Sequence, residues 1–150
     1  SVASRGLGDV YKRQFLSIPK EVYLNTKKKF KKNSTIGLLS TEATLDTKIY
    51  HKYFEKNYNL ISPNERLQKN SVNIAIKYVK KGKVKDAEKV LRPAVRFLMK
   101  KKCKKIILGC TELPIAIFAY KSFKRAKDSK LFIDPNLLLA QVCMKKYKKY

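Results

Sequence analysis

KKIILGCTELP, at residues 104–114, combines the features of a buried strand with those of a reactive site. Ile106 to Leu108 form a short apolar run, which is typical of a strand that is covered on both faces. Gly109 ends this run, and Cys110 and Thr111 follow on the turn into a helix that we expect to begin near Pro114. Open parallel sheets bind ligands outside the carboxyl ends of their strands, and a helix amino terminus favours a thiolate. The stretch therefore predicts a reactive cysteine at the edge of a sheet.

Helix and strand patterns alternate along the rest of the chain after Phe15. Apolar spacing and turn residues predict strands at 35–39, 60–61, 106–108 and 131–133. The same criteria predict helices at 19–32, from Asp46 through Phe54, at 65–79, at 84–101, after Pro114 and from Asn136. Regular alternation of this kind favours βα units, and we expect an α/β fold with a mainly parallel sheet flanked by helices.

Several single residues indicate where these helices begin, end or bend. Asp46 is suited to cap the helix that follows it, and Gly82 is suited to end the helix before it. Pro93 should kink or split the helix at 84–101. In the first and last helices, we expect Leu24 to make apolar contacts and Cys143 to be a small core residue.

The composition limits the classes of protein to which the chain can belong. The chain has 150 residues, of which 44% are hydrophobic, as expected for one globular domain. Its amino terminus lacks the pattern of a signal peptide, and no apolar run approaches the ~20 residues that span a bilayer. Three widely spaced cysteines do not suggest a disulfide framework. We expect a cytoplasmic protein that is not bound to a membrane.

The formal net charge of +25 points first to nucleic acid. The charge is mostly lysine spread over every segment, however, and arginine, which makes bidentate contacts with bases and phosphates, is scarce. Abundant asparagine, isoleucine and tyrosine are what an A/T-biased coding sequence would produce. We expect weak, salt-sensitive binding to polyanions but no specific nucleic acid. The alternative, a basic nucleic-acid-binding module, requires that the lysines gather on one face.

The start of the chain is unusual. It opens at Ser1, and its first methionine is Met99. Residues 1–14 resemble a translated adapter tail, and we expect them to be non-native. We expect residues 15–150 to be the C-terminal α/β part of a longer protein whose N-terminal domain is missing.

Four segments together resemble the aspartate/glutamate racemase family. GCTELP at 109–114 is similar to the second catalytic cysteine motif of its aspartate racemase branch, and GLLSTEAT at 37–44 is similar to a strand and loop that contact substrate. Residues 76–82 and IDP at 133–135, followed by Leu139 and Ala140, match two further segments in the family's order. Glu112 argues against glutamate racemase proper, which carries histidine there.

The resemblance implies one of two pseudo-symmetric racemase domains together with the closing C-terminal segment. It implies a racemase that interconverts L- and D-aspartate, or glutamate, without a cofactor or metal, in a homodimer. One cysteine thiolate removes the α-proton, and a thiol on the opposite face returns one. Only Cys110 matches a catalytic position here, because the family's other cysteine lies in a Cys-Asn-Thr motif that this chain lacks. We therefore expect this chain alone to be inactive.

The resemblance also suggests substrate-binding residues, each with an ordinary alternative. Thr111 would bind a substrate carboxylate or cap a helix, and Glu112 would orient the site or favour the helix dipole. Thr44 and, more weakly, Thr41 would contact substrate, although a simple turn would also explain them. Lys80 would attract the acidic substrate or lie in solvent. A non-catalytic relative that binds a dicarboxylate is a third possibility.

Overall fold

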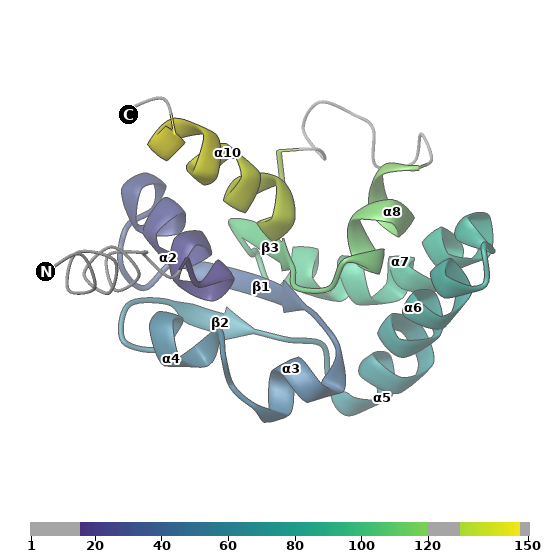
Figure 1. Ribbon diagram of the computed structural model, residues 1–150. Helices are drawn as coiled ribbons and strands as arrows, with labels where there is room; N and C mark the ends of the chain where they lie inside the picture. Colours follow the sequence, from purple (N-terminus) through teal and green to yellow (C-terminus); the bar gives the residue numbers. More distant parts are fainter. Residues whose placement is uncertain (1–15, 120–129, 148–150) are drawn as a thin grey trace, which may run out of the picture.

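The computed structural model describes residues 16–119 and 130–147. Its centre is a four-stranded sheet built from β1 (Thr35–Leu39), β2 (Asn59–Ile61), β3 (Lys105–Leu108) and β4 (Phe132–Ile133). The strands run parallel in the order β2-β1-β3-β4. The arrows of β1 and β2 accordingly point the same way in Figure 1. The predicted α/β fold with a parallel sheet is confirmed, whereas the adapter-like residues 1–14 lie outside the described residues.

Helices cover both faces of this sheet (Figure 1). The helix α2 (Ile18–Lys29) packs with α4 (His51–Phe54) and α10 (Pro135–Tyr147) on one face. The other face carries α5 (Glu65–Leu67), α6 (Asn73–Lys80), α7 (Val84–Lys100) and α8 (Glu112–Phe118). The short α3 (Glu42–Asp46) follows β1. None of the described helices is both long and apolar enough to cross a membrane.

The core alternates along the strands because successive side chains point to opposite faces of a sheet. Ile106 and Leu108 are buried against the α6–α8 side, while Ile107 between them is buried against α2 and α4. Ile36 and Leu38 of β1 also face the α2 and α4 side. Strands that are buried on both faces read as continuous apolar runs, which is why the run at 106–108 predicted its strand.

Gly82 ends its helix as the sequence predicts. Its φ is 73°, its N–H donates to the carbonyl of Val79 at 2.9 Å, and the N–H of Lys83 donates to Tyr78 at 2.9 Å. This is the hydrogen-bond pattern of a helix closed by a left-handed residue. Pro93, in contrast, does not split α7, which runs through it without a break. Pro93 is exposed, so water can reach the carbonyl that it leaves without a donor.

Two helix predictions were wrong in detail, and the one near Pro114 is confirmed within two residues. Asp46 ends α3 rather than capping the next helix, because Thr41 begins a short helix that the sequence pattern did not reveal. The predicted helix at 65–79 contains a π-helical turn at Gln68–Val72. The helix expected near Pro114 begins at Glu112, and Pro114 fits its first turn because the N–H groups there have no intrahelical acceptor.

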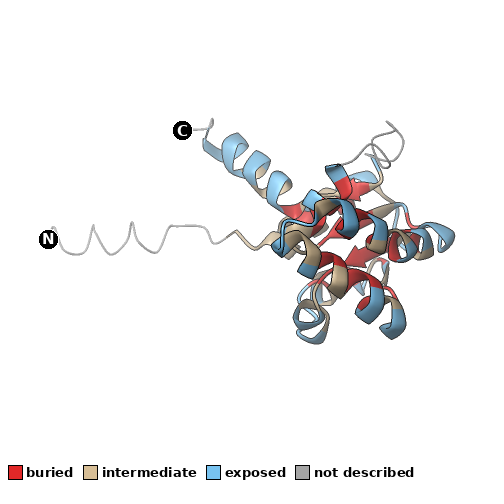
Figure 2. Cartoon of the chain, turned by 90° about the vertical axis from the view of Figure 1, so that its right-hand side faces the viewer, coloured by how far each residue is buried: buried red, intermediate tan, exposed pale blue. Residues whose placement is uncertain are grey.

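The expectation that Cys143 is a small core residue was also wrong. Leu24 is 37% exposed, and Cys143 is exposed on α10 rather than buried in a core. Figure 2 shows why, since most of α10 is coloured as exposed. It packs against α2, and its apolar residues are not covered on the remaining faces among the described residues.

We predict an alkaline loss of stability that depends on Cys103. Burial raises the pKa of its thiol from 9.0 to about 11, so the folded state keeps the proton that the unfolded chain loses near pH 9. The protonated Cys103 thiol contributes fully to the free energy of unfolding below about pH 9. This contribution is lost as the pH rises to about 11, which lowers the free energy of unfolding by roughly 2 kcal/mol. Urea unfolding at the two ends of this window should show a smaller loss in Cys103→Ala than in the wild type. Equal losses would contradict the prediction.

Candidate active site

The candidate site lies where the parallel strands end. The backbone N–H of Gly109 donates to the carbonyl of Leu39 at 2.7 Å, which holds the turn after β3 against the end of β1. Cys110 and Thr111 follow directly, before α8 begins at Glu112. The strand predicted from KKIILGCTELP thus delivers the cysteine to the carboxyl edge of the sheet.

Gly109 is needed because this turn is tightly packed. A Cβ atom there would lie 3.1 Å from Leu38 Cδ1, 3.1 Å from Ser40 Cβ and 3.3 Å from the Leu39 carbonyl oxygen. The carbonyl belongs to a strand and cannot move freely. We predict that Gly109→Ala lowers the free energy of unfolding by about 1–2 kcal/mol, as measured by denaturant titration. A change below about 0.5 kcal/mol would show that the turn adapts without cost.

Cys110, Thr111 and Glu112 form one hydrogen-bonded cluster. The half-buried Cys110 thiol donates to Glu112 Oε2 at 2.8 Å, and the Thr111 hydroxyl donates to the same oxygen at 2.8 Å. These two bonds hold the pKa of the Glu112 carboxyl below its usual value, so it stays charged. The hydroxyl of Thr111 does not cap α8. The capping alternative for this threonine is therefore wrong.

The protonation of Cys110 differs from the sequence expectation. Burial, followed by the hydrogen bond to the charged Glu112, raises the pKa of its thiol to about 11. The expected thiolate is thus a thiol, because desolvation and an adjacent carboxylate outweigh the short helix α8. With the proton on sulfur and an acceptor beside it, Cys110 is arranged as an acid.

Lys80 approaches this cluster from the end of α6. Its Nζ lies 3.8 Å from Glu112 Oε1, and 65% of its side chain is exposed. Its charge also opposes the rise in the pKa of Cys110. An ion pair this open contributes little to stability, so Lys80 can exchange Glu112 for another carboxylate at low cost.

Thr41 and Thr44 form a second cluster, after β1. Thr41 Oγ1 accepts the N–H of Thr44 at 3.2 Å and lies 3.0 Å from its hydroxyl. Thr41 therefore caps α3, a local structural role that differs from the simple turn expected as its ordinary alternative. Among the described residues, neither threonine hydrogen-bonds to Cys110, Thr111 or Glu112.

The sequence reasoning missed a polar network behind the Thr41 loop. Gln68, in the π-helical turn, is 4% exposed and donates to the Ser40 carbonyl and to Asn73 Oδ1, both at 2.9 Å. Asn73 in turn donates to Glu42 Oε1 at 2.9 Å. The network fixes the loop after β1 against α6. No pattern in the sequence marks it, because the partners are 28 and 31 residues apart.

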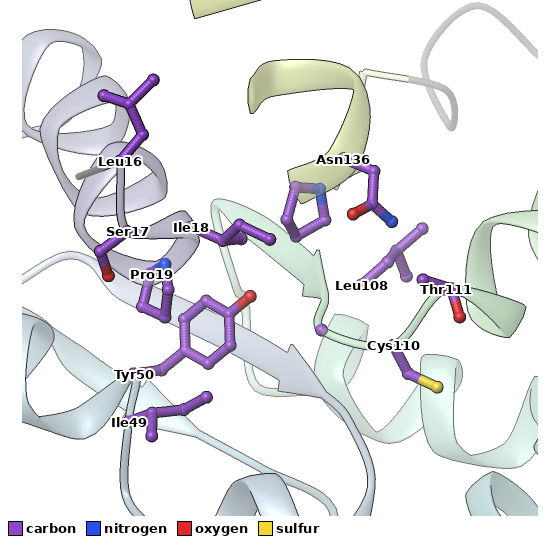
Figure 3. A pocket seen from close by; sticks show the side chains of 12 residues that line it. Leu16, Ser17, Ile18, Pro19, Ile49, Tyr50, Leu108, Cys110, Thr111 and Asn136 are labelled. Carbon is purple, nitrogen blue, oxygen red and sulfur yellow. The ribbon is translucent and has the colours of Figure 1, made fainter. Parts of the chain in front are cut away.

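A pocket of about 400 Å³ adjoins the cysteine. The Tyr50 hydroxyl points into this pocket, whereas the Cys110 sulfur points away from it (Figure 3). Burial raises the pKa of Tyr50 to about 12, so the phenol is neutral there. The pocket therefore borders the cysteine backbone and not the reactive atom. Its lining is Leu16, Ser17, Ile18, Pro19, Ile49, Tyr50, Leu108, Gly109, Cys110, Thr111, Pro135 and Asn136.

The other two cysteines lie elsewhere. Cys103 precedes β3 and is buried, so the whole strand separates it from Cys110. Cys143 is exposed on α10, eight residues after Pro135 and about 12 Å along the helix axis. In the described part of the chain, no group of three or more histidine, cysteine or acidic side chains could hold a metal ion.

Solved structures share this fold. An aspartate racemase from Picrophilus torridus is 28% identical with a TM-score of 0.70, and the match covers 90% of this chain and 53% of that one. An aspartate racemase homologue from Pyrococcus horikoshii, 22% identical, has the same TM-score and is matched over 97% and 62% of the two chains. The second comparison supports the fold alone.

A curated relative and a family model extend the comparison. An uncharacterised protein from the region 3′ of pnlA in Pectobacterium carotovorum is 35% identical over 83 residues, which is 55% of each chain. This chain thus spans about half the length of the relatives that it matches. The model of the Asp/Glu/hydantoin racemases matches residues 12–143, a range that includes each of the four described strands and both clusters described above. The chain belongs to the Asp/Glu/hydantoin racemase family.

Proposed function

We propose that this chain supplies one half of the active site of a cofactor-independent racemase that interconverts L- and D-aspartate. The observation that carries the proposal is the Cys110 thiol, held at a strand end by a hydrogen bond to Glu112. Aspartate is favoured over glutamate because a 28%-identical structure is that of an aspartate racemase. Glu112 supplies the carboxylate beside the reactive sulfur. This carboxylate also accepts a hydrogen bond from Thr111 and forms an ion pair with Lys80.

In the proposed mechanism, Cys110 acts as the acid. A thiolate on the opposite face of the substrate takes the α-proton, and the electron pair of the broken C–H bond stays on the α-carbon and its carboxylate. The Cys110 S–H bond then breaks, its proton forms the new C–H bond with inverted configuration, and sulfur keeps the electron pair. Cys110 ends as a thiolate and the other cysteine as a thiol, so the reverse reaction starts from the complementary state.

The surrounding residues would bind and orient the substrate. Lys80 would leave Glu112 for a substrate carboxylate, and the hydroxyls of Thr111 and Thr44 would donate to carboxylate oxygens. Thr41 would hold Thr44 in place through its cap. The exposure of Lys80 and Thr111 supports these roles, because both can reach a ligand that arrives from solvent.

The second cysteine would come from outside this chain. Cys103 and Cys143 are too far along their elements to face Cys110 across one carbon atom. We propose that residues 15–150 are the C-terminal part of a two-domain enzyme whose first domain carries a Cys-Asn-Thr motif. A homodimer and a cytoplasmic location stay predictions from the sequence.

The test begins with the gene. We expect its sequence upstream of the Phe15 codon to encode a strand followed by Cys-Asn-Thr. The protein encoded by that whole frame should interconvert L- and D-aspartate in a chiral chromatography assay, and should turn over glutamate more slowly. An intact frame without an upstream cysteine motif, or a complete protein that leaves both enantiomers unchanged, would overturn the proposal.

A further inference from the structure

Lysines precede every strand of the parallel sheet. The connection into β1 contains Lys31 and Lys32, the connection into β2 contains Lys56, and Lys130 precedes β4. Among the described residues, the connection into β3 is the richest and contains Lys101, Lys102 and Lys104. Because all four strands run the same way, these connections meet at the amino-terminal edge of the sheet. We call these seven lysines the basic edge.

Backbone hydrogen bonds fix the connections side by side. The N–H of Asn33 donates to the Asn57 carbonyl at 2.7 Å, which joins the entries to β1 and β2. The N–H of Lys104 donates to the Thr35 carbonyl at 2.8 Å, which joins the entries to β1 and β3. Lys105 Nζ donates to the Lys130 carbonyl, which adds the entry to β4. The basic edge is therefore one continuous row and not a set of separate loops.

Lys105, in β3, lies close enough to Lys29 and Lys130 to be affected by their charges. Burial, followed by the charges of Lys29 and Lys130, lowers the pKa of the Lys105 amine. These three residues come from three different parts of the chain, at the end of α2, in β3 and before β4. The only acidic residue in the described connections into the strands is Glu55. The positive charge of the row is thus left without a matching number of carboxylates.

At the carboxyl-terminal edge of the sheet, the described connections that follow the strands are acidic and not basic. In the described residues, no lysine or arginine lies between the end of a strand and the start of the next helix. Each of these connections instead carries an acidic residue or leads directly into one, namely Glu42, Glu65, Glu112 and Asp134. The helix dipole explains lysines within the last turns of α2 and α7, but Lys31, Lys32 and Lys104 lie beyond those helix ends. The topology thus brings lysines from four separate connections to one edge of the sheet.

We propose that the basic edge binds the phosphate backbone of nucleic acid, independently of base sequence. Four strands spaced about 4.8 Å apart give a row roughly 15 Å long, which spans several phosphates of a duplex. The basic edge offers lysines and no arginine fork for reading bases. None of its described connections exposes a large apolar side chain, so nothing in them would insert into a membrane. The proposal is independent of the racemase proposal, whose site lies at the other edge.

Two matched variants test the proposal with the full chain. The edge variant replaces four exposed lysines by glutamine, and the control replaces four exposed lysines of α6, α7 and the turn between them, so both lose the same charge. The edge variant carries substitutions at Lys31, Lys32, Lys56 and Lys104, and the control carries them at Lys77, Lys81, Lys85 and Lys89. Binding to a short fluorescein-labelled DNA duplex of arbitrary sequence is followed by anisotropy from about 50 to 200 mM salt.

We expect the wild type and the control to bind with similar affinity, and the edge variant to bind at least tenfold more weakly at about 100 mM salt. The slope of log affinity against log salt should fall by about 0.9 for each phosphate that the variant no longer neutralises. Equal weakening in both variants would overturn the proposal, because total charge and not the edge would then govern binding. Binding to phosphatidylserine vesicles without binding to the duplex would also overturn it. Unchanged thermal unfolding of both variants shows that the comparison concerns the surface and not the fold.

Discussion

Replacing Cys110 by alanine in the complete protein should abolish racemisation of aspartate. Under the proposed mechanism this thiol returns the proton, and positioned acids or bases typically contribute a factor of about 10²–10⁴. The loss should appear in the rate of turnover and not in the affinity for substrate, because the side chain is not proposed to bind a carboxylate. Chiral chromatography of both enantiomers measures it.

Isotope exchange separates this role from a structural one. In deuterated water, the variant should still incorporate deuterium at the α-carbon of the one enantiomer whose proton faces the other cysteine, without inversion. The matched control is Cys143→Ala, which removes an exposed thiol on α10 and should leave both reactions unchanged. Loss of exchange from both enantiomers would contradict the one-face role, and full activity in the alanine variant would contradict any role.

Glu112→Gln should make Cys110 react faster with iodoacetamide at about pH 8. Burial, the hydrogen bond to Glu112 and the charge of Glu112 all raise the pKa of this thiol to about 11, so the neutral amide should lower it while burial keeps it above the ordinary 9.0. Each unit by which the pKa falls increases the thiolate fraction at this pH, and thus the rate, about tenfold. Peptide mass spectrometry reads Cys110 separately from the other cysteines of the chain.

The other thiols provide the internal controls for this measurement. The rate at the exposed Cys143 should be the same in both proteins, which corrects for reagent and pH. Buried Cys103 should stay slow in both, and its faster reaction would reveal unfolding. An unchanged or slower rate at Cys110 in the glutamine variant would show that burial alone sets its pKa.

The sequence predicted the sheet because its strands are short apolar runs between turn residues. Ile106 to Leu108 and Gly109 placed Cys110 at the carboxyl edge, and the structure has it there. Such a prediction needs only local patterns, since a parallel sheet brings all strand ends to the same edge. Lys80 was also expected at the site, and it does lie 3.8 Å from Glu112.

What the sequence could not predict depends on contacts between residues that are distant in the chain or on the direction of one side chain. The protonation of Cys110 follows first from its burial and then from the rotamer of Glu112, which accepts the hydrogen bond of the thiol. The apolar residues Leu138, Leu139 and Val142 favoured a buried Cys143, but an apolar helix face is buried only if another element lies against it. The lysines looked evenly distributed because the order of residues along a chain does not show which connections share a sheet edge.

The helix α10 should unfold locally before the sheet does. This helix is joined to the rest chiefly along α2, and most of its residues face solvent (Figure 2). Segments with few buried apolar contacts open locally at a lower free energy than the core, so its amides should exchange with solvent before those of β1 and β3. Its first residues, Pro135 and Asn136, form part of the pocket wall beside Cys110. Release of this one helix would therefore enlarge the pocket while the sheet that carries the cysteine keeps its shape.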